Sequence, residues 1–241
     1  MNWMIQFFGW LFSACDTIVK LVISGSRNQQ QVQHLKDEMQ LFISNKDYGK
    51  TAVATDVASQ LAAWQQFYLA EFEMTCDFSS LAIPKQRKGF GWLIVVAQGL
   101  TIEQVFQQCR KHFPCGKYTD RDLDAAVPTN DRNPKDGPYA VWVRDTVEAD
   151  SQYKNRSANF LKEQEVSGIT LLERLLLELK YFLETGGNHL DLRNVTLCSG
   201  SRYVDGFVPR VCWRSDWLDV GWYSPGSAFD CLRAREVVAD A

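Results

Sequence analysis

The sequence lacks the excess of basic residues that nucleic-acid binding usually requires. Its 241 residues include 26 Lys and Arg against 29 Asp and Glu, which leaves a net charge of −3. Affinity for a phosphate backbone comes mainly from neutralising it with Lys and Arg. Composition does not exclude a local basic patch, but nucleic acid is not the expected partner.

Complete motifs for the common metal and hydrolase sites are also missing. Cys109, His112 and Cys115 lie close together in sequence, but zinc takes about four ligands and no further Cys or His pair follows. No G-x-S-x-G elbow surrounds a serine. The sequence therefore predicts no metal and no cofactor.

The cysteines do not form a disulfide pattern. There are seven, an odd number, scattered along a chain that is too long to depend on disulfides for stability. We interpret them as reduced thiols in a reducing compartment, which predicts a cytoplasmic protein.

Apolar residues dominate residues 1–24, and the first basic residue is Lys20, so an export signal is not expected. On a helix, the polar residues from Asn2 to Lys20 would share one narrow stripe. A buried helix, a helix in a membrane interface and a membrane span all stay open, although Asp16 and Lys20 make a span costly. We predict an amphipathic helix over residues 1–24, a helical region over 25–80 and an α+β domain over 88–241.

The clearest single element is a helix within residues 167–188. Thr170 and Glu173 form a capping box, and Gly186 provides a left-handed stop. A leucine-rich face runs from Leu172 to Phe182 at helical spacing, while Glu173 is assigned to the polar face.

The hydrophobic period changes after residue 90. Residues 92–97, 139–144 and 194–198 are apolar and rich in β-branched residues, which predicts strands. Residues 207–213 and 217–223 predict a C-terminal hairpin, and residues 227–238 predict a short helix. The expected fold class is α+β, with a mixed sheet of about five strands and flanking helices.

The loop at 118–137 contains a weak candidate for a metal site. Asp120, Asp122, Asp124 and Asp131 match the ligand spacing of an EF-hand calcium loop. Ala125, however, stands where that loop needs Gly, and its closing residue is Asp rather than Glu. A solvated or helix-capping acidic run explains the pattern more simply.

A weak catalytic candidate follows the leucine-rich helix. His189, Asp191 and Cys198 supply a base, an orienting acid and a nucleophile within ten residues. This pattern suggests acyl transfer, although the surrounding residues form no known nucleophile motif.

Aromatic and arginine side chains gather on the predicted hairpin, which makes it the expected recognition surface. Trp213, Trp217, Trp222 and Arg214 are of the residue types that dominate binding hot spots. Core packing is the alternative role for most of them.

Several segments resemble a family of hypothetical proteins that recur in environmental bacterial genomes. The segments are YAVWVRDTVEAD (139–150), GITLLERLLLELKYFLETGGNHLD (168–191), NVTLCSGSRYVDGFVP (194–209), WYSPG (222–226) and LRAREVV (232–238). The resemblance is to the C-terminal module of that family and covers residues 89–238. It implies a bacterial, intracellular protein with a more variable N-terminal region, and it assigns no activity.

The leading hypothesis is a non-catalytic interaction or accessory protein. It would bind a protein partner or a second copy, or contact a membrane peripherally, through residues 1–24 or the aromatic hairpin. The alternative is a small hydrolase or metal-assisted enzyme that uses the Asp120–Asp136 loop or the neighbourhood of His189, Asp191 and Cys198.

Overall fold

The structure is a computed structural model that describes residues 56–239, which belong to one compact unit of the chain. The predicted amphipathic helix over residues 1–24, and the helical region up to residue 55, lie outside the described residues. Within residues 56–239, no helix combines the length and the apolar character needed to cross a membrane.

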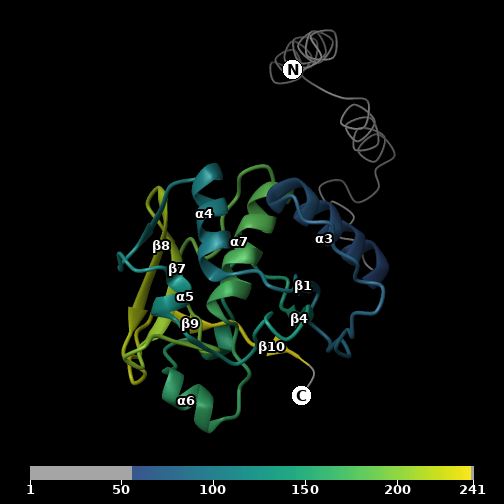
Figure 1. Ribbon diagram of the computed structural model, residues 1–241. Helices are drawn as coiled ribbons and strands as arrows, with labels where there is room; N and C mark the ends of the chain where they lie inside the picture. The colour runs from purple at the N-terminus through teal and green to yellow at the C-terminus, as the bar shows by residue number, and fades with distance from the viewer. Residues whose placement is uncertain (1–55, 240–241) are drawn as a thin grey trace, which may run out of the picture. The chain divides into compact units, whose positions relative to one another are not determined.

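The predicted α+β fold class is confirmed (Figure 1). The helices are α3 (Val57–Phe72), α4 (Ile102–His112), α5 (Leu123–Ala126), α6 (Ala158–Glu163), α7 (Leu171–Glu184) and the 3₁₀ turn η1 (Ser151–Tyr153). The strands are β1 (Trp92–Val96), β2 (Cys115–Lys117), β3 (Thr129–Asn130), β4 (Tyr139–Val143), β5 (Val195–Leu197), β6 (Ser201–Arg202), β7 (Val208–Arg214), β8 (Trp217–Tyr223), β9 (Leu232–Ala234) and β10 (Val237–Val238).

A mixed five-stranded sheet forms around the predicted hairpin, in the order β2-β8-β7-β5-β9. Strands β7 and β8 pair along their whole length, from Val208 opposite Tyr223 to Arg214 opposite Trp217. The edge strands β2 and β9 run parallel to their neighbours, and a separate sheet has the order β1-β4-β10.

Helix α7 lies between the two sheets and contacts both β1 and β7 (Figure 1). Its N-terminus has the predicted capping box, in which Thr170 accepts from the Glu173 N–H and the Glu173 side chain accepts from the Thr170 N–H. Its buried leucines include Leu172, Leu175 and Leu179. Each fully buried leucine stabilises the fold by about 1.5–3 kcal/mol. Glu173, which was assigned to the polar face of this helix, has a fully buried side chain.

The predicted C-terminal helix over residues 227–238 is wrong. In its place, β9 pairs with β5, and β10 pairs with β4. Ala, Leu, Arg and Glu favour a helix locally, but pairing with two existing sheets satisfies the backbone and buries the apolar side chains together. The end of the chain therefore links the two sheets.

Candidate functional site

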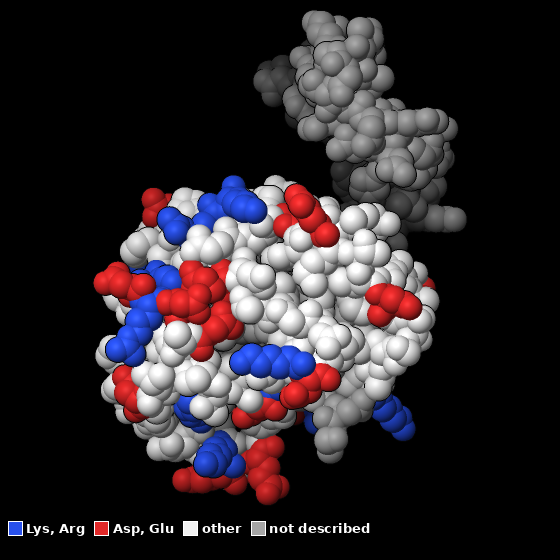
Figure 2. All heavy atoms as spheres, in the orientation of Figure 1, with Lys and Arg blue, Asp and Glu red and all other residues white. Residues whose placement is uncertain are grey.

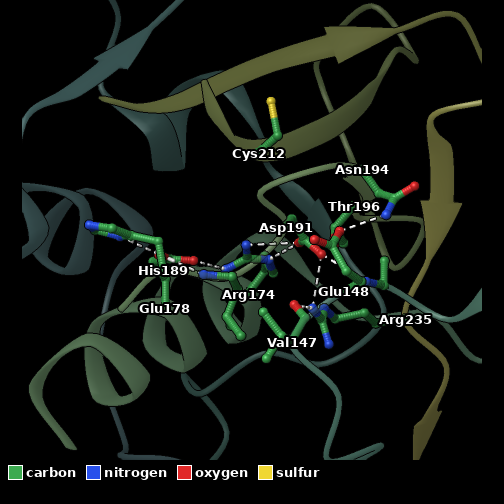
Figure 3. Close-up of polar contacts among 12 residues, drawn as sticks. Val147, Glu148, Arg174, Glu178, His189, Asp191, Asn194, Thr196, Cys212 and Arg235 are labelled. Carbon is green, nitrogen blue, oxygen red and sulfur yellow. Dashed lines mark hydrogen bonds and ion pairs between the residues drawn. The ribbon is translucent and has the colours of Figure 1, made fainter. Parts of the chain in front are cut away.

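Asp191 lies at the centre of a group of buried charged side chains (Figure 3). It follows α7, just before β5, and its φ of 54° lies in the left-handed region, which Asp enters more readily than most residues. The residue is completely buried. Its carboxylate therefore requires compensation from groups inside the protein.

Groups from several elements meet at this carboxylate. Oδ1 accepts from the Ala149 N–H at 2.8 Å and from Arg235 Nη2 at 2.9 Å. Oδ2 accepts from Arg174 Nε at 3.1 Å and Nη2 at 2.8 Å, and also from the hydroxyl of Thr196. One side chain thus joins α7, β5, the segment before η1 and the β9–β10 connection.

The two arginines keep Asp191 ionised. Burial alone would raise the pKa of Asp191, but Arg235 and Arg174, together with the Thr196 hydrogen bond, outweigh it and hold the pKa below its ordinary value. A carboxylate held in this way is a poor proton acceptor at neutral pH. The geometry suits a structural anchor better than a general base.

A second branch of the network leads from Arg174 towards the surface. Arg174 Nη1 donates to Glu178 Oε2 at 2.7 Å, and Glu178 Oε1 lies 2.8 Å from His189 Nδ1. The His189 ring stacks on Trp213, with centroids 3.4 Å apart and planes inclined by 11°. Arg174 and Glu178 are fully buried, whereas 11% of the His189 side chain is exposed.

His189 is the one residue of the network with an arrangement that proton transfer could use. A carboxylate at Nδ1 fixes the orientation of an imidazole and favours the tautomer with a free Nε2. Among residues 56–239, Nε2 has no hydrogen-bond partner, and the atom is not fully buried. Nε2 is therefore the ring nitrogen that no described residue engages.

The structure brings His189 and Asp191 into one network but does not bond them to each other. Glu178 and Arg174 stand between them. The Cys198 thiol is completely buried, and burial raises its pKa well above the ordinary value, so it stays protonated. None of the three predicted catalytic residues lines either of two open pockets, of about 280 and 600 Å³, on the described part of the chain.

In the acidic loop, two of the four predicted metal ligands cap helices. Asp122 accepts the N–H groups of Asp124 and Ala125 at 2.8 and 3.2 Å and begins α5. Asp124 accepts the N–H groups of Ile102 and Glu103, both at 3.0 Å, at the first turn of α4. These carboxylates compensate helix N-termini, as acidic residues at such positions commonly do.

The other two predicted ligands do not complete a metal site. Asp120 and Asp131 are both exposed, although desolvation by neighbouring groups raises the pKa of Asp131 above its ordinary value. No group of three His, Cys, Asp or Glu side chains in residues 56–239 is placed to hold a metal ion. Cys109, in the C-x₂-H-x₂-C segment, is buried and its thiol faces the Leu175 carbonyl.

The four predicted binding residues of the hairpin do not form one cluster. Trp213 stacks on His189, whereas Trp217 and Trp222 are 39% and 45% exposed. Trp217 and Trp222 lie five residues apart on β8 and so project from opposite faces. The Arg214 side chain is 58% exposed, and its guanidinium lies 3.8 Å from the Asp219 carboxylate.

The face of the hairpin that carries Trp217 also holds a buried ion pair. Arg210 Nη1 donates to Asp219 Oδ2 at 2.6 Å. The guanidinium lies across Gly221, where an added Cβ would approach it to 2.8 Å. Tyr118 and Tyr223 flank it, with ring centroids 5.5 and 5.6 Å away. Arg210 Nε and Asp219 Oδ1 have no hydrogen-bond partner among the described residues.

Surface charge gives no further indication of a ligand. On the face shown in Figure 2, Lys and Arg alternate with Asp and Glu, and a broad uncharged area lies between them. An extended patch of one sign, as polyanion binding requires, is not visible there.

The fold and the network define an α+β protein organised around a buried group of paired charges. Comparison with protein-family models, with curated proteins and with solved structures finds no match to this chain.

Proposed function

We propose that this chain is a non-catalytic interaction protein. The supporting observation is that its candidate catalytic side chains are buried or charge-paired, whereas two tryptophans are exposed. Asp191 is held by two arginines and Cys198 is buried with a raised pKa. Trp217 and Trp222 remain 39% and 45% exposed, and Trp is among the residue types that dominate binding hot spots.

Two segments are proposed to dock. The first is residues 1–24, whose apolar residues and single polar stripe suit a protein groove or a membrane interface. The second is the β7–β8 hairpin, which exposes Trp217 and Arg214 on one face and Trp222 on the other. The partner is another protein or a second copy of this chain, and peripheral contact of residues 1–24 with a membrane is also proposed.

Liposome flotation and light scattering of the full chain test this proposal. Two variants separate the segments: Trp3→Asp with Phe7→Asp for residues 1–24, and Trp217→Ser with Trp222→Ser for the hairpin. We expect the full chain to float or self-associate, and one of the variants to lose that property. A full chain that stays monomeric and unbound, with both variants identical to it, would contradict docking on membranes or on a second copy.

The small-hydrolase alternative rests on the Glu178–His189 hydrogen bond and the accessible Nε2 of His189. Hydrolysis of an activated ester by the full chain and by His189→Ala measures it directly. The interaction proposal predicts equal, background rates for both proteins, whereas a rate that falls with His189→Ala would favour the alternative.

A further inference from the structure

Three of the four outer edges of the two larger sheets are closed by other parts of the chain. At β1, the Trp64 and Tyr68 side chains of α3 donate to the outward backbone carbonyls. At β9, the Ala234 carbonyl accepts from a backbone N–H outside the sheet, and at β10 the Val237 N–H donates to a carbonyl outside the sheet. Backbone groups that are already bonded in this way offer no template for a further strand.

The fourth edge, strand β2, is open. The backbone bonds of Pro114 and Tyr118 to β8 place Gly116 towards β8 and direct Cys115 and Lys117 away from it. Among residues 56–239, the backbone N–H and C=O groups of Cys115 and Lys117 have no hydrogen-bond partner, and both residues are partly exposed. Figure 1 shows the segment between α4 and α5 beyond β8, at the margin of the fold. Two donors and two acceptors are therefore free to bond with an extended peptide.

Aromatic side chains lie beside this edge on the outer face of the sheet. The Trp217 ring lies over Gly116, where an added Cβ would approach it to 2.8 Å. Trp217 is 39% exposed, and Tyr118, directly after β2, is 54% exposed. A residue paired opposite Gly116 would point to this same face, because opposite residues of neighbouring strands share a face. An apolar side chain suits that position.

The other face beside β2 carries basic residues. The side chains of Cys115 and Lys117 point to it, and the last turn of α4 adds the exposed Arg110 and Lys111. Arg110 is close enough to counteract, in part, the rise that burial causes in the pKa of the Cys115 thiol. Lys117 is paired with Glu103 at 2.7 Å, whereas Arg110 and Lys111 form no ion pair within residues 56–239. An acidic strand would be attracted here, whereas a second copy of this edge would bring like charges together.

We propose that β2 accepts an extended acidic segment of a partner protein as an additional strand of the sheet. The backbone of the segment bonds with Cys115 and Lys117. Its acidic side chains lie beside Arg110 and Lys111, and its apolar side chains lie beside Trp217. The segment therefore alternates acidic and apolar residues, as a strand with two different faces does. Trp217 belongs to the hairpin proposed above to dock, so this inference rests on that proposal and specifies the chemistry of the partner.

The probe is a short peptide that alternates Glu and Val, added to the full chain. Titration calorimetry measures its affinity, and amide hydrogen exchange reports on Cys115 and Lys117, with Gly116 as the internal control. Two control peptides separate the contributions. One carries Lys in place of Glu, and the other keeps Glu and Val but is N-methylated along one edge, which removes the backbone donors of that edge.

In the free chain, we expect the amides of Cys115 and Lys117 to exchange rapidly, whereas Gly116, which is bonded to β8, is protected. At a peptide concentration of about ten times the Kd, exchange at Cys115 and Lys117 should slow by about tenfold. Neither the Lys peptide nor the N-methylated peptide should bind at the same concentration.

Two pairs of substitutions test the contribution of charge. Arg110→Gln with Lys111→Gln should weaken binding of the Glu peptide by about fivefold, because two exposed ion pairs are lost. Lys154→Gln with Arg193→Gln is the matched control, since both residues are exposed and lie outside α4, β2 and the hairpin. Trp222→Ser should also leave the affinity unchanged, because Trp222 lies on the opposite face of β8 from Trp217.

Four results would overturn the proposal. They are protection of Cys115 and Lys117 in the free monomer, absence of binding by the Glu peptide, binding that leaves exchange at these amides unchanged, and equal affinity for either control peptide. A dimer by light scattering in which these amides are protected without peptide would assign the edge to a second copy instead.

Failure of this inference is distinguishable from failure of the proposed docking. If flotation or self-association depends on the hairpin while the Glu peptide does not bind, only the acidic segment is contradicted. A chain that neither docks nor binds the peptide contradicts both.

Discussion

Helices α7 and α3 both pack against β1, but different interactions hold them in place. Nine of the 14 residues of α7 are buried, among them Glu173, Arg174 and Glu178. Three of the 16 residues of α3 are buried, and its contacts with β1 include hydrogen bonds to the strand's open edge. Helix α7 is part of the core, whereas α3 is a cover over a strand that would otherwise expose its backbone.

The buried charged residues of α7 show that buried charge need not indicate a catalytic site. Arg174 and Asp191 are both fully buried, yet their bonds run to groups that connect α7 with β5, the segment before η1 and the β9–β10 connection. A buried ion pair contributes little net stability, but removing one partner leaves the other charge uncompensated and strongly destabilises the fold. The network therefore commits these elements to one arrangement.

The largest expected effect is at the centre of the α7 network. Asp191→Asn keeps the side-chain shape but leaves Arg174 and Arg235 without their shared carboxylate, which should lower the free energy of unfolding by about 3–5 kcal/mol. Urea denaturation measures the loss. The exposed carboxylate of Asp216, in the β7–β8 turn, provides the control Asp216→Asn, which should change stability by less than about 0.5 kcal/mol. Equal effects for the two variants would show that the network contributes little.

The pH dependence of stability sharpens the same point. Because the folded-state pKa of Asp191 is lowered, its contribution is present above the unfolded pKa of about 3.9 and is lost as pH falls through the folded value. The stability difference between the wild type and Asp191→Asn should therefore be constant from pH 7 to about pH 5 and shrink below about pH 4. Chemical denaturation at several pH values provides the measurement. A difference that grows on acidification would contradict the lowered pKa.

A smaller effect is expected at α3. Tyr68→Phe leaves the ring in place but removes the partner of the Val95 carbonyl and the Ala97 N–H, which should cost about 1–3 kcal/mol. Tyr181→Phe on α7 is the matched control, because no hydrogen bond of its hydroxyl is found among residues 56–239. A stability loss equal to that of the control would remove the evidence that α3 covers the edge through Tyr68.

The smallest stability losses are expected for substitutions in the capping boxes of α7 and α4. Thr170→Ala and Thr101→Ala each remove an N-cap acceptor, at an expected cost of about 1 kcal/mol. Thr170 is completely buried whereas Thr101 is partly exposed, so water can replace only the Thr101 hydroxyl. Thermal unfolding should therefore show the larger loss for Thr170→Ala, and the opposite order would contradict this explanation.

Local signals in the sequence predicted the elements that local interactions determine. The capping box of Thr170 and Glu173 and the hairpin of β7 and β8 lie where the sequence placed them. The prediction of a helix over residues 227–238 was wrong because these residues form strands that pair with β5 and β4, far away in the sequence. Long-range pairing overrides helix propensity, and no local pattern reports it.

The network around Asp191 could not be predicted from the sequence, because it too depends on residues that are far apart along the chain. Asp191 was noted as a catalytic candidate, but its arginines lie 17 and 44 residues away along the chain. The one available signal was the spacing of Arg174 and Glu178, four residues apart within a leucine-rich helix. That spacing is equally typical of an exposed ion pair on a helix surface, so by itself it does not indicate burial.

Native-state hydrogen exchange tests the central claim, that α7 belongs to the core and α3 is a separable cover. The claim predicts that the amides of Trp64, Tyr68, Leu93 and Ala97 exchange through one partial opening, at a lower free energy than the amides of Leu175 and Leu179. The α7 amides should exchange only through global unfolding. A single free energy shared by all six amides would contradict the claim.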